Sequence, residues 1–293
     1  MKFAPLFLRL MFCCAGLFSV YAVAADQPET SRQEGPQRIV SVGSDMTEIA
    51  FALGMGSQIV ATDTTSSWPL AAQQTPKVGY LRNLAAEGVL SLAPDVLLLA
   101  SAAGPGSTLR QLATSGIRMH TAPGSYTLEA VREKIRMTGQ ALRKTEAAAV
   151  LLKQFDREVI ALHAQQALLT DRPRVVFLLS VAKGGLQAAG QDTAAQAVLE
   201  LIKAENVFSH QGYKAVSSEA MIQSNPAVIL MMAQSIRRSG GRRAVLNRPA
   251  VSLTEAGKHG RLVEIDGPAL LAFGPRVAAS AIELAQRVRR LPH

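Results

Sequence analysis

The chain contains, at residues 87–98, the stretch EGVLSLAPDVLL, in which a short helical pattern ends at a proline and a buried-type strand follows. Residues 219–230 repeat this layout with the stretch EAMIQSNPAVIL. In both stretches a glutamate, Glu87 or Glu219, stands seven residues before the proline. The same succession of helix, proline and apolar strand at two distant positions predicts two copies of one α/β unit.

The segments that precede the two stretches also correspond. Strand-like runs begin at Arg38 and Arg174, which lie 49 and 45 residues before the two glutamates. Helical patterns follow over residues 47–53 in the first copy and 193–201 in the second. Alternating strands and helices are typical of a parallel sheet covered by helices. The predicted fold class is therefore α/β, with two Rossmann-like lobes.

Residues 127–169 differ from the rest because they contain no proline, a single glycine, Gly139, and apolar residues at helical spacing. They predict one long helix, or two helices with a kink near Gly139. About forty helical residues would span roughly 60 Å, more than one small domain needs, so the helix is expected to connect two lobes. The predicted organisation is an N-terminal lobe over 26–126, a long connecting helix over 127–170 and a C-terminal lobe over 171–293, with a ligand site between the lobes.

Residues 1–25 have the pattern of a cleavable secretory signal peptide. Lys2 and Arg9 precede an uncharged run of sixteen residues, and small residues at 22 and 24 form a cleavage site. This run is shorter than the roughly 20 residues of a membrane-spanning helix. Both cysteines, Cys13 and Cys14, lie in this segment, so the mature chain is expected to have no disulfide and no thiolate metal site. The expected location is a bacterial periplasm.

The net charge of +9 suits an anionic partner, which can be a nucleic acid, an anionic membrane or an anionic small molecule. The densest basic group, at 237–238 and 242–243, is too sparse for a nucleic-acid-binding tail, so no nucleic acid is expected. The sequence has no nucleophile elbow, no Walker loop and no dinucleotide-binding glycine motif after a strand. No two of the five histidines lie within one helical turn of each other. These patterns predict a binding protein rather than an enzyme.

Tyr80 is the first candidate ligand-binding residue, because it follows Gly79 in a loop that leads into a helix. A phenol binds ferric iron as the phenolate, which needs a group that stabilises the anion. Arg82 can supply that group, since residues i and i+2 of an extended segment point to one side. Tyrosine is an established haem ligand. From these residues alone, a loop tyrosine that packs its ring against the domain edge remains the alternative.

Several motifs together resemble the haem-binding periplasmic proteins of bacterial haem ABC importers, over most of the mature chain. The motifs are VGYLRNL at 78–84, SAAGP at 101–105, QAAG at 187–190, GYK at 212–214 and FGPR at 273–276. The resemblance implies a class III periplasmic binding protein, with two lobes and one long connecting helix, that binds haem b non-covalently. It implies that Tyr80 is the axial ligand of the haem iron and that Arg82 assists it. Tyr213, on the second lobe, would meet the other haem face or a propionate.

The resemblance also implies a partner. Glu87 and Glu219 would dock onto arginines of the two subunits of an inner-membrane ABC permease, one anchor on each lobe. The alternative is that both glutamates merely favour the helix dipole in a first turn. The chain departs from its relatives at 232–234, where they can place an arginine; Arg237 or Arg238 would then take over a propionate, or neither would. A histidine that helps some relatives hold a second haem is absent near 191–192, which argues for one haem in a monomeric chain.

The predicted function is capture of haem in the cleft and its delivery to the transporter. Two alternatives remain open from the sequence. The ligand can be cobalamin or a ferric siderophore, in which case Tyr80 only packs against it. The protein can also belong to another class, such as an exported α/β enzyme or a surface adhesin, although the missing catalytic motifs and the duplicated lobes argue against these.

Overall fold

The structure is a computed structural model that describes residues 37–182 and 185–291. The predicted signal peptide, with Cys13 and Cys14, lies outside the described residues. Among the residues that are described, no helix has both the length and the apolar character that crossing a membrane requires.

The first lobe is built on a four-stranded parallel sheet in the order β2-β1-β5-β6. Its strands are β1 (Ile39–Val42), β2 (Ile59–Thr62), β5 (Val96–Leu99) and β6 (Arg118–Thr121). Every residue of β1 and β5 is buried, as expected for central strands that are covered on both faces. The helical segments of this lobe are α1 (Ser44–Ala52), η1 (Gly56–Gln58), α2 (Leu70–Gln73), α3 (Ala86–Leu90) and α4 (Gly106–Ala113). A two-stranded hairpin, β3 (Gly79–Tyr80) and β4 (Asn83–Leu84), precedes α3.

The second lobe contains a parallel sheet in the order β9-β7-β11-β12, extended by two antiparallel strands, β8 and β10. Its strands are β7 (Arg174–Ala182), β8 (Gly185–Ala189), β9 (Glu205–Asn206), β10 (Tyr213–Val216), β11 (Val228–Met232) and β12 (Leu262–Ile265). Its helices are α7 (Ala194–Leu201), α8 (Ser218–Ser224), α9 (Ala233–Arg238), α10 (Arg242–Leu246), α11 (Pro249–Ser252), α12 (Glu255–Lys258), α13 (Gly267–Leu271) and α14 (Val277–Arg289).

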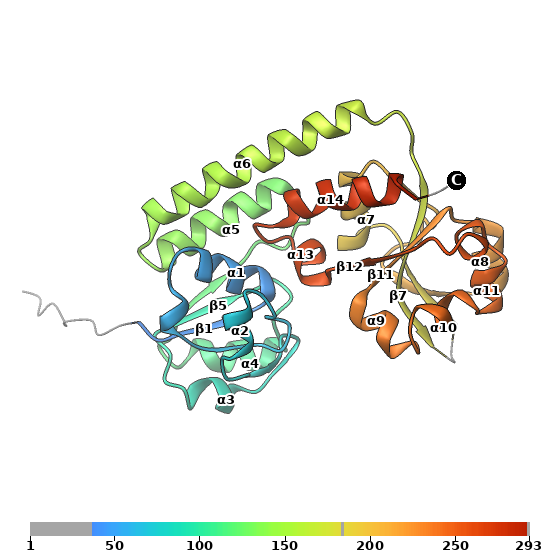
Figure 1. The fold of residues 1–293 in the computed structure, drawn as a ribbon. Helices are drawn as coiled ribbons and strands as arrows, with labels where there is room; N and C mark the ends of the chain where they lie inside the picture. Colours follow the sequence, from blue (N-terminus) through green and yellow to red (C-terminus); the bar gives the residue numbers. More distant parts are fainter. Residues whose placement is uncertain (1–36, 183–184, 292–293) are drawn as a thin grey trace, which may run out of the picture. The chain divides into compact units, whose positions relative to one another are not determined.

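The two parallel sheets have the same topology. Strand order β2-β1-β5-β6 in the first lobe corresponds, strand by strand along the chain, to β9-β7-β11-β12 in the second. The helices before the third strand of each set, α3 and α8, correspond as well, and each has its glutamate in the first turn. The predicted α/β fold class and the duplicated unit are therefore confirmed (Figure 1).

The connecting segment forms two helices, α5 (Leu128–Ala141) and α6 (Thr145–Leu168), which is the second of the two predicted alternatives, and α6 is the long helix that reaches the second lobe. The break lies at Arg143, which has a φ of +55°, and not at Gly139 itself. Gly139 lets the helices approach, because a Cβ there would lie 2.4 Å from the Cβ of Ala148. Helix α5 packs on α1 of the first lobe, and α6, about 36 Å long, continues to the second lobe (Figure 1).

A buried polar joint ties the lobes together beside these helices. Lys134 of α5 is 4% exposed, and its ammonium pairs with Asp45 of α1 at 2.6 Å. The same ammonium donates to the carbonyls of Ala272 and Phe273, each at 3.1 Å. Lys134 thus satisfies all three of its N–H groups, and it fixes the segment between α13 and α14 against the first lobe.

Arg276 completes this joint. Its guanidinium donates to both carboxylate oxygens of Glu48 in α1, pairs with Asp266 at 3.3 Å and lies 4.8 Å from the ring centroid of Trp68. Burial raises the pKa of Glu48, and Arg276 opposes that rise. The joint holds residues 273–276 in place, and it gives each of the two buried carboxylates of α1, Asp45 and Glu48, a cationic partner.

Candidate ligand-binding site

Tyr80 and Arg82 form a hydrogen-bonded pair on the β3–β4 hairpin. A guanidinium N–H of Arg82 donates to the hydroxyl oxygen of Tyr80 at 2.6 Å, and the guanidinium carbon lies 5.8 Å from the centre of the tyrosine ring. Tyr80 is 44% exposed, so its ring is accessible to a ligand. The hairpin therefore presents a phenol oxygen with a cationic donor already in place.

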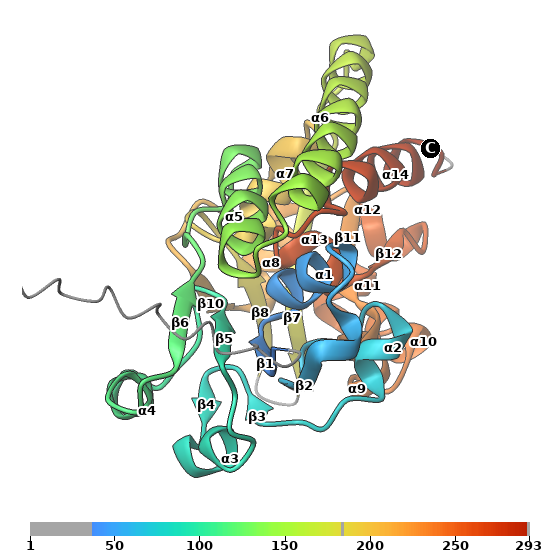
Figure 2. The same ribbon diagram turned by 90° about the vertical axis from the view of Figure 1, so that its left-hand side faces the viewer.

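The backbone of this hairpin is fixed from both sides. Gly79, with a φ of +102°, accepts a hydrogen bond at its carbonyl from the amide of Thr64 at 2.9 Å. Gly104 donates its amide to Leu81 and accepts one from Leu84, both at 2.8 Å. Leu81 and Leu84 are buried, so the side chains between them point outward from a rigid base. In Figure 2 the hairpin and α3 lie together at the foot of the first lobe.

Tyr213 comes from the second lobe, at the first residue of β10. Its ring lies edge-on to Phe177 with centroids 6.4 Å apart. Burial raises the pKa of the Tyr213 hydroxyl and the nearby Tyr126 raises it further, whereas hydrogen bonds with Ala195 and Thr193 and the positive charge of Arg82 lower it. Arg82 of the first lobe is therefore close enough to Tyr213 of the second for its charge to lower the pKa of the Tyr213 hydroxyl.

Tyr126 is a residue of this site that the sequence analysis missed. It lies in the loop between β6 and α5, is 43% exposed, and packs its ring against Phe273 with centroids 5.6 Å apart. It also interacts electrostatically with Tyr213. The position of Tyr126 after the carboxyl end of a strand is a signal that could have identified it, because ligands of parallel α/β sheets bind at the loops that follow these strand ends.

Arg237 lies in a different place. It is exposed on α9 and lines a cavity of about 660 Å³ with Ser67 of the first lobe and Gln234 of the second. Neither Tyr80 nor Arg82 lines this cavity. Two carboxylates, Glu264 and Asp266, and a second arginine, Arg287, complete its polar lining. Arg237 is thus accessible to a ligand in this cavity, but the structure does not bring it together with Tyr80 and Arg82.

Glu87 and Glu219 occupy equivalent positions in the first turns of α3 and α8. Both are exposed, and neither carboxylate forms an ion pair within the part of the chain that the structure describes. Hydrogen bonds to the backbone of Glu219 itself and to the Ser217 side chain lower the pKa of Glu219. This local geometry agrees with a helix-start role, and it leaves both carboxylates available to an external cation.

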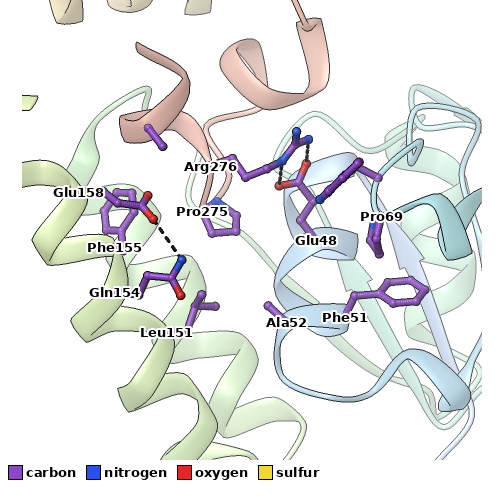
Figure 3. Close-up of a pocket in the computed structure, with 12 residues that line it drawn as sticks. Glu48, Phe51, Ala52, Pro69, Leu151, Gln154, Phe155, Glu158, Pro275 and Arg276 are labelled. Atoms are coloured by element: carbon purple, nitrogen blue, oxygen red, sulfur yellow. Dashed lines mark hydrogen bonds and ion pairs between the residues drawn. The ribbon is translucent and has the colours of Figure 1, made fainter. Parts of the chain in front are cut away.

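A second cavity, of about 390 Å³, lies at the joint between α1, α6 and the start of α14 (Figure 3). Its walls are mainly apolar, with Phe51, Leu151 and Phe155 among them. Its charged lining residues are Glu48 and Arg276, which pair with each other, and Glu158, which accepts a hydrogen bond from Gln154. None of the predicted site residues lines this cavity, so it belongs to the joint and not to the tyrosine site.

The duplicated sheets, the helical connection and the polar residues that face each other from both lobes define a two-lobed solute-binding protein. Residues 39–269 match the family model described as periplasmic binding protein, and the chain belongs to this family. Members of this family bind substrates for transport and are not enzymes, which confirms the predicted class and sets the enzyme and adhesin alternatives aside.

Solved structures of two relatives are close to this chain. The periplasmic heme-binding protein BhuT, in complex with two hemes, is 36% identical with a TM-score of 0.83, over 87% of this chain and 98% of that one. The periplasmic heme-binding protein HutB of Vibrio cholerae is 34% identical with a TM-score of 0.76, over 86% of this chain and 98% of that one. A vitamin B12-binding protein of Vibrio parahaemolyticus is 26% identical over 72% of this chain and 76% of its own length.

Proposed function

We propose that this protein is a periplasmic haem carrier, which captures haem between its lobes and delivers it to an inner-membrane ABC transporter. The observation that carries the proposal is the 2.6 Å hydrogen bond from Arg82 to the hydroxyl oxygen of Tyr80 on an exposed, rigid hairpin. The similarity to heme-binding proteins at 34–36% identity supports the same ligand.

The chemistry of this pair suits ferric haem. A phenolate is a hard anionic donor that favours ferric iron, and a guanidinium donor stabilises the anion relative to the neutral phenol. Tyr80 is thus the axial ligand in this proposal, and Arg82 donates a hydrogen bond to its oxygen. The ligand is haem b, bound non-covalently, since both cysteines lie in the proposed signal peptide at 1–25.

The second lobe supplies the opposite wall. Tyr213 packs edge-on to Phe177, Tyr126 packs against Phe273, and aromatic rings of this kind pack well against a flat porphyrin. Arg237 serves a propionate in the cavity that it shares with Ser67 and Gln234. One haem binds to each monomeric chain.

Delivery uses the two exposed glutamates. Glu87 and Glu219 stand on equivalent helices of the two lobes, so each can meet an arginine of one subunit of a permease dimer. Lobes over 26–126 and 171–293, joined through 127–170, would keep these anchors at a fixed separation. No nucleic acid takes part.

A cobalamin carrier is the second candidate, because the vitamin B12-binding relatives share the fold at 26% identity. Cobalamin carries its own cobalt ligands, so it would leave Tyr80 without a metal to bind. The haem proposal is preferred because the heme-binding relatives are more similar and because the Tyr80–Arg82 pair then has a chemical purpose.

The experiment is a parallel titration of the purified protein with ferric haem and with cyanocobalamin, followed by visible absorbance and by quenching of Trp68, the single tryptophan. The proposal expects saturable binding of haem and none of cobalamin. It also expects that Tyr80→Phe, which removes only the hydroxyl, changes the haem spectrum, whereas His259→Ala on the surface leaves it unchanged. Saturable cobalamin binding without haem binding would replace the first candidate by the second.

A further inference from the structure

The connection between β11 and β12, residues 233–261, has a large excess of positive charge. It has seven lysine and arginine residues against a single glutamate, a net charge of +6 out of +9 for the whole chain. The equivalent connection of the first lobe, residues 100–117 between β5 and β6, has one charged residue, Arg110. The two lobes share a topology, so the fold itself does not require this excess. The seven are Arg237, Arg238, Arg242, Arg243, Arg248, Lys258 and Arg261.

Few of these basic side chains are neutralised by a carboxylate of the segment. Arg238 and Arg243 are exposed, and within the described residues neither forms an ion pair. Lys258 is exposed and shares Glu255 with His259. Arg242 differs, because it donates to the carbonyls of Gly260 and Leu262 and so holds α10 against the start of β12. Seven cations with a single carboxylate in the same segment repel one another, which indicates an anionic partner outside the chain.

An exposed apolar side chain stands in the same segment. Leu253, directly after α11, is 56% exposed. Basic residues that surround a protruding leucine are typical of surfaces that lie on a membrane, where the leucine enters the boundary between headgroups and acyl chains.

The segment also lies against the proposed docking helix. Helix α11 packs on α8, which carries Glu219. The amide of Glu255, the first residue of α12, donates to the side chain of Asn225 at the end of α8, at 2.8 Å. Figure 1 shows α8, α10 and α11 grouped at the same end of the second lobe. When Glu219 rests on a permease subunit, the basic segment lies beside it.

We propose that Arg238, Arg243 and Lys258, with the exposed Leu253, form a membrane-facing surface that binds the anionic phospholipid headgroups of the outer leaflet of the inner membrane around the transporter. This inference rests on the proposed function for its orientation, since Glu219 is what turns the surface toward the bilayer. The attraction reaches only about one Debye length, near 8 Å at physiological salt, so it acts on a protein that is already close to the bilayer. The surface would concentrate the carrier at the membrane and orient its second lobe before it docks.

The experiment is flotation of the haem-free and haem-loaded chain with vesicles of phosphatidylcholine alone, and with vesicles in which about a third of the lipid is phosphatidylglycerol. One variant combines Arg238→Gln, Arg243→Gln and Lys258→Gln. The matched control combines Arg110→Gln, Lys153→Gln and Arg157→Gln, which removes the same net charge from exposed positions of the first lobe and α6. Thermal unfolding and haem titration of both variants confirm that fold and ligand site are intact.

The wild-type chain should bind the anionic vesicles only, and high salt should release it. The first variant should lose roughly 100-fold in partition coefficient, since each basic residue near an anionic surface contributes about fivefold, and the control should bind like the wild type. Equal losses in both variants would show that net charge and not this surface matters, and would overturn the proposal. The proposal would also be overturned if the first variant kept its vesicle binding but lost affinity for the transporter in detergent, because the partner would then be an acidic protein surface. A failure of the haem proposal is separate, since it would appear as absent haem binding with vesicle binding preserved.

Discussion

The buried ion pair between Lys134 and Asp45 is expected to be a main source of stability for the joint between the lobes. Asp45→Asn keeps the shape of the side chain but leaves the ammonium of Lys134, which is 4% exposed, without a counter-charge. Breaking one side of a buried pair costs about 3–5 kcal/mol. The lower end, about 3 kcal/mol, applies here, since the carbonyls of Ala272 and Phe273 and the new amide oxygen still accept hydrogen bonds from Lys134.

Urea unfolding followed by the fluorescence of Trp68 measures this loss, because the only tryptophan lies 4.8 Å from the Arg276 guanidinium at the joint. The control is Glu129→Gln, which breaks the pairs of this exposed carboxylate with Arg132 and Arg136 and should change the unfolding free energy little. A loss below about 1 kcal/mol in Asp45→Asn, or a loss equal to that of the control, would refute the reasoning. Haem affinity should fall together with stability, because Tyr80 and Tyr213 stand on different lobes and the proposed haem site needs the joint to hold these lobes together.

Three further perturbations test other contacts. Arg276→Met should destabilise the protein little below pH 4.5, where Glu48 is protonated and uncharged. The loss of stability should grow as the pH rises through the raised pKa of that buried carboxyl, because the carboxylate then lacks its cationic partner. Unfolding measured at several pH values checks this, and a loss that does not depend on pH would contradict it. Gly139→Ala should cost about 1–3 kcal/mol, because its Cβ would lie 2.4 Å from Ala148, whereas Gly88→Ala in α3 meets no atom within 4 Å and should gain up to about 1 kcal/mol. Glu87→Ala combined with Glu219→Ala should abolish transport into vesicles that contain the transporter while haem binding stays unchanged; normal transport would leave both glutamates as simple helix-start residues.

The fold could be predicted from the sequence because its signals are local. The strands β5 and β11 are continuous apolar runs after a proline, and their burial follows from composition alone. The duplication could be recognised from two such runs at similar spacing. The break between α5 and α6 was located less well, because an arginine in the left-handed conformation, as at position 143, has no sequence signature. The kink was predicted near Gly139, but this glycine instead allows the close approach of α5 to Ala148 of α6.

The residues alone predict a contact in the candidate site only where the partners are neighbours along the chain, and Tyr213 was named from the resemblance. Tyr80 and Arg82 are two residues apart, so an extended backbone suffices to predict their contact, which the structure shows. Tyr126 was missed because its contact with Phe273 joins residues 147 positions apart. The pairing of Lys134 with Asp45 spans 89 positions, and a lysine within a helical pattern is ordinarily a solvent-exposed residue.

The central claim, that Tyr80 binds the haem iron, is tested most directly by resonance Raman spectroscopy of the ferric haem complex. The account predicts a vibration of an iron–phenolate bond in the wild-type protein, which disappears in Tyr80→Phe and persists in Tyr126→Phe and Tyr213→Phe. Survival of this vibration in Tyr80→Phe, or its loss in Tyr213→Phe alone, would contradict the account.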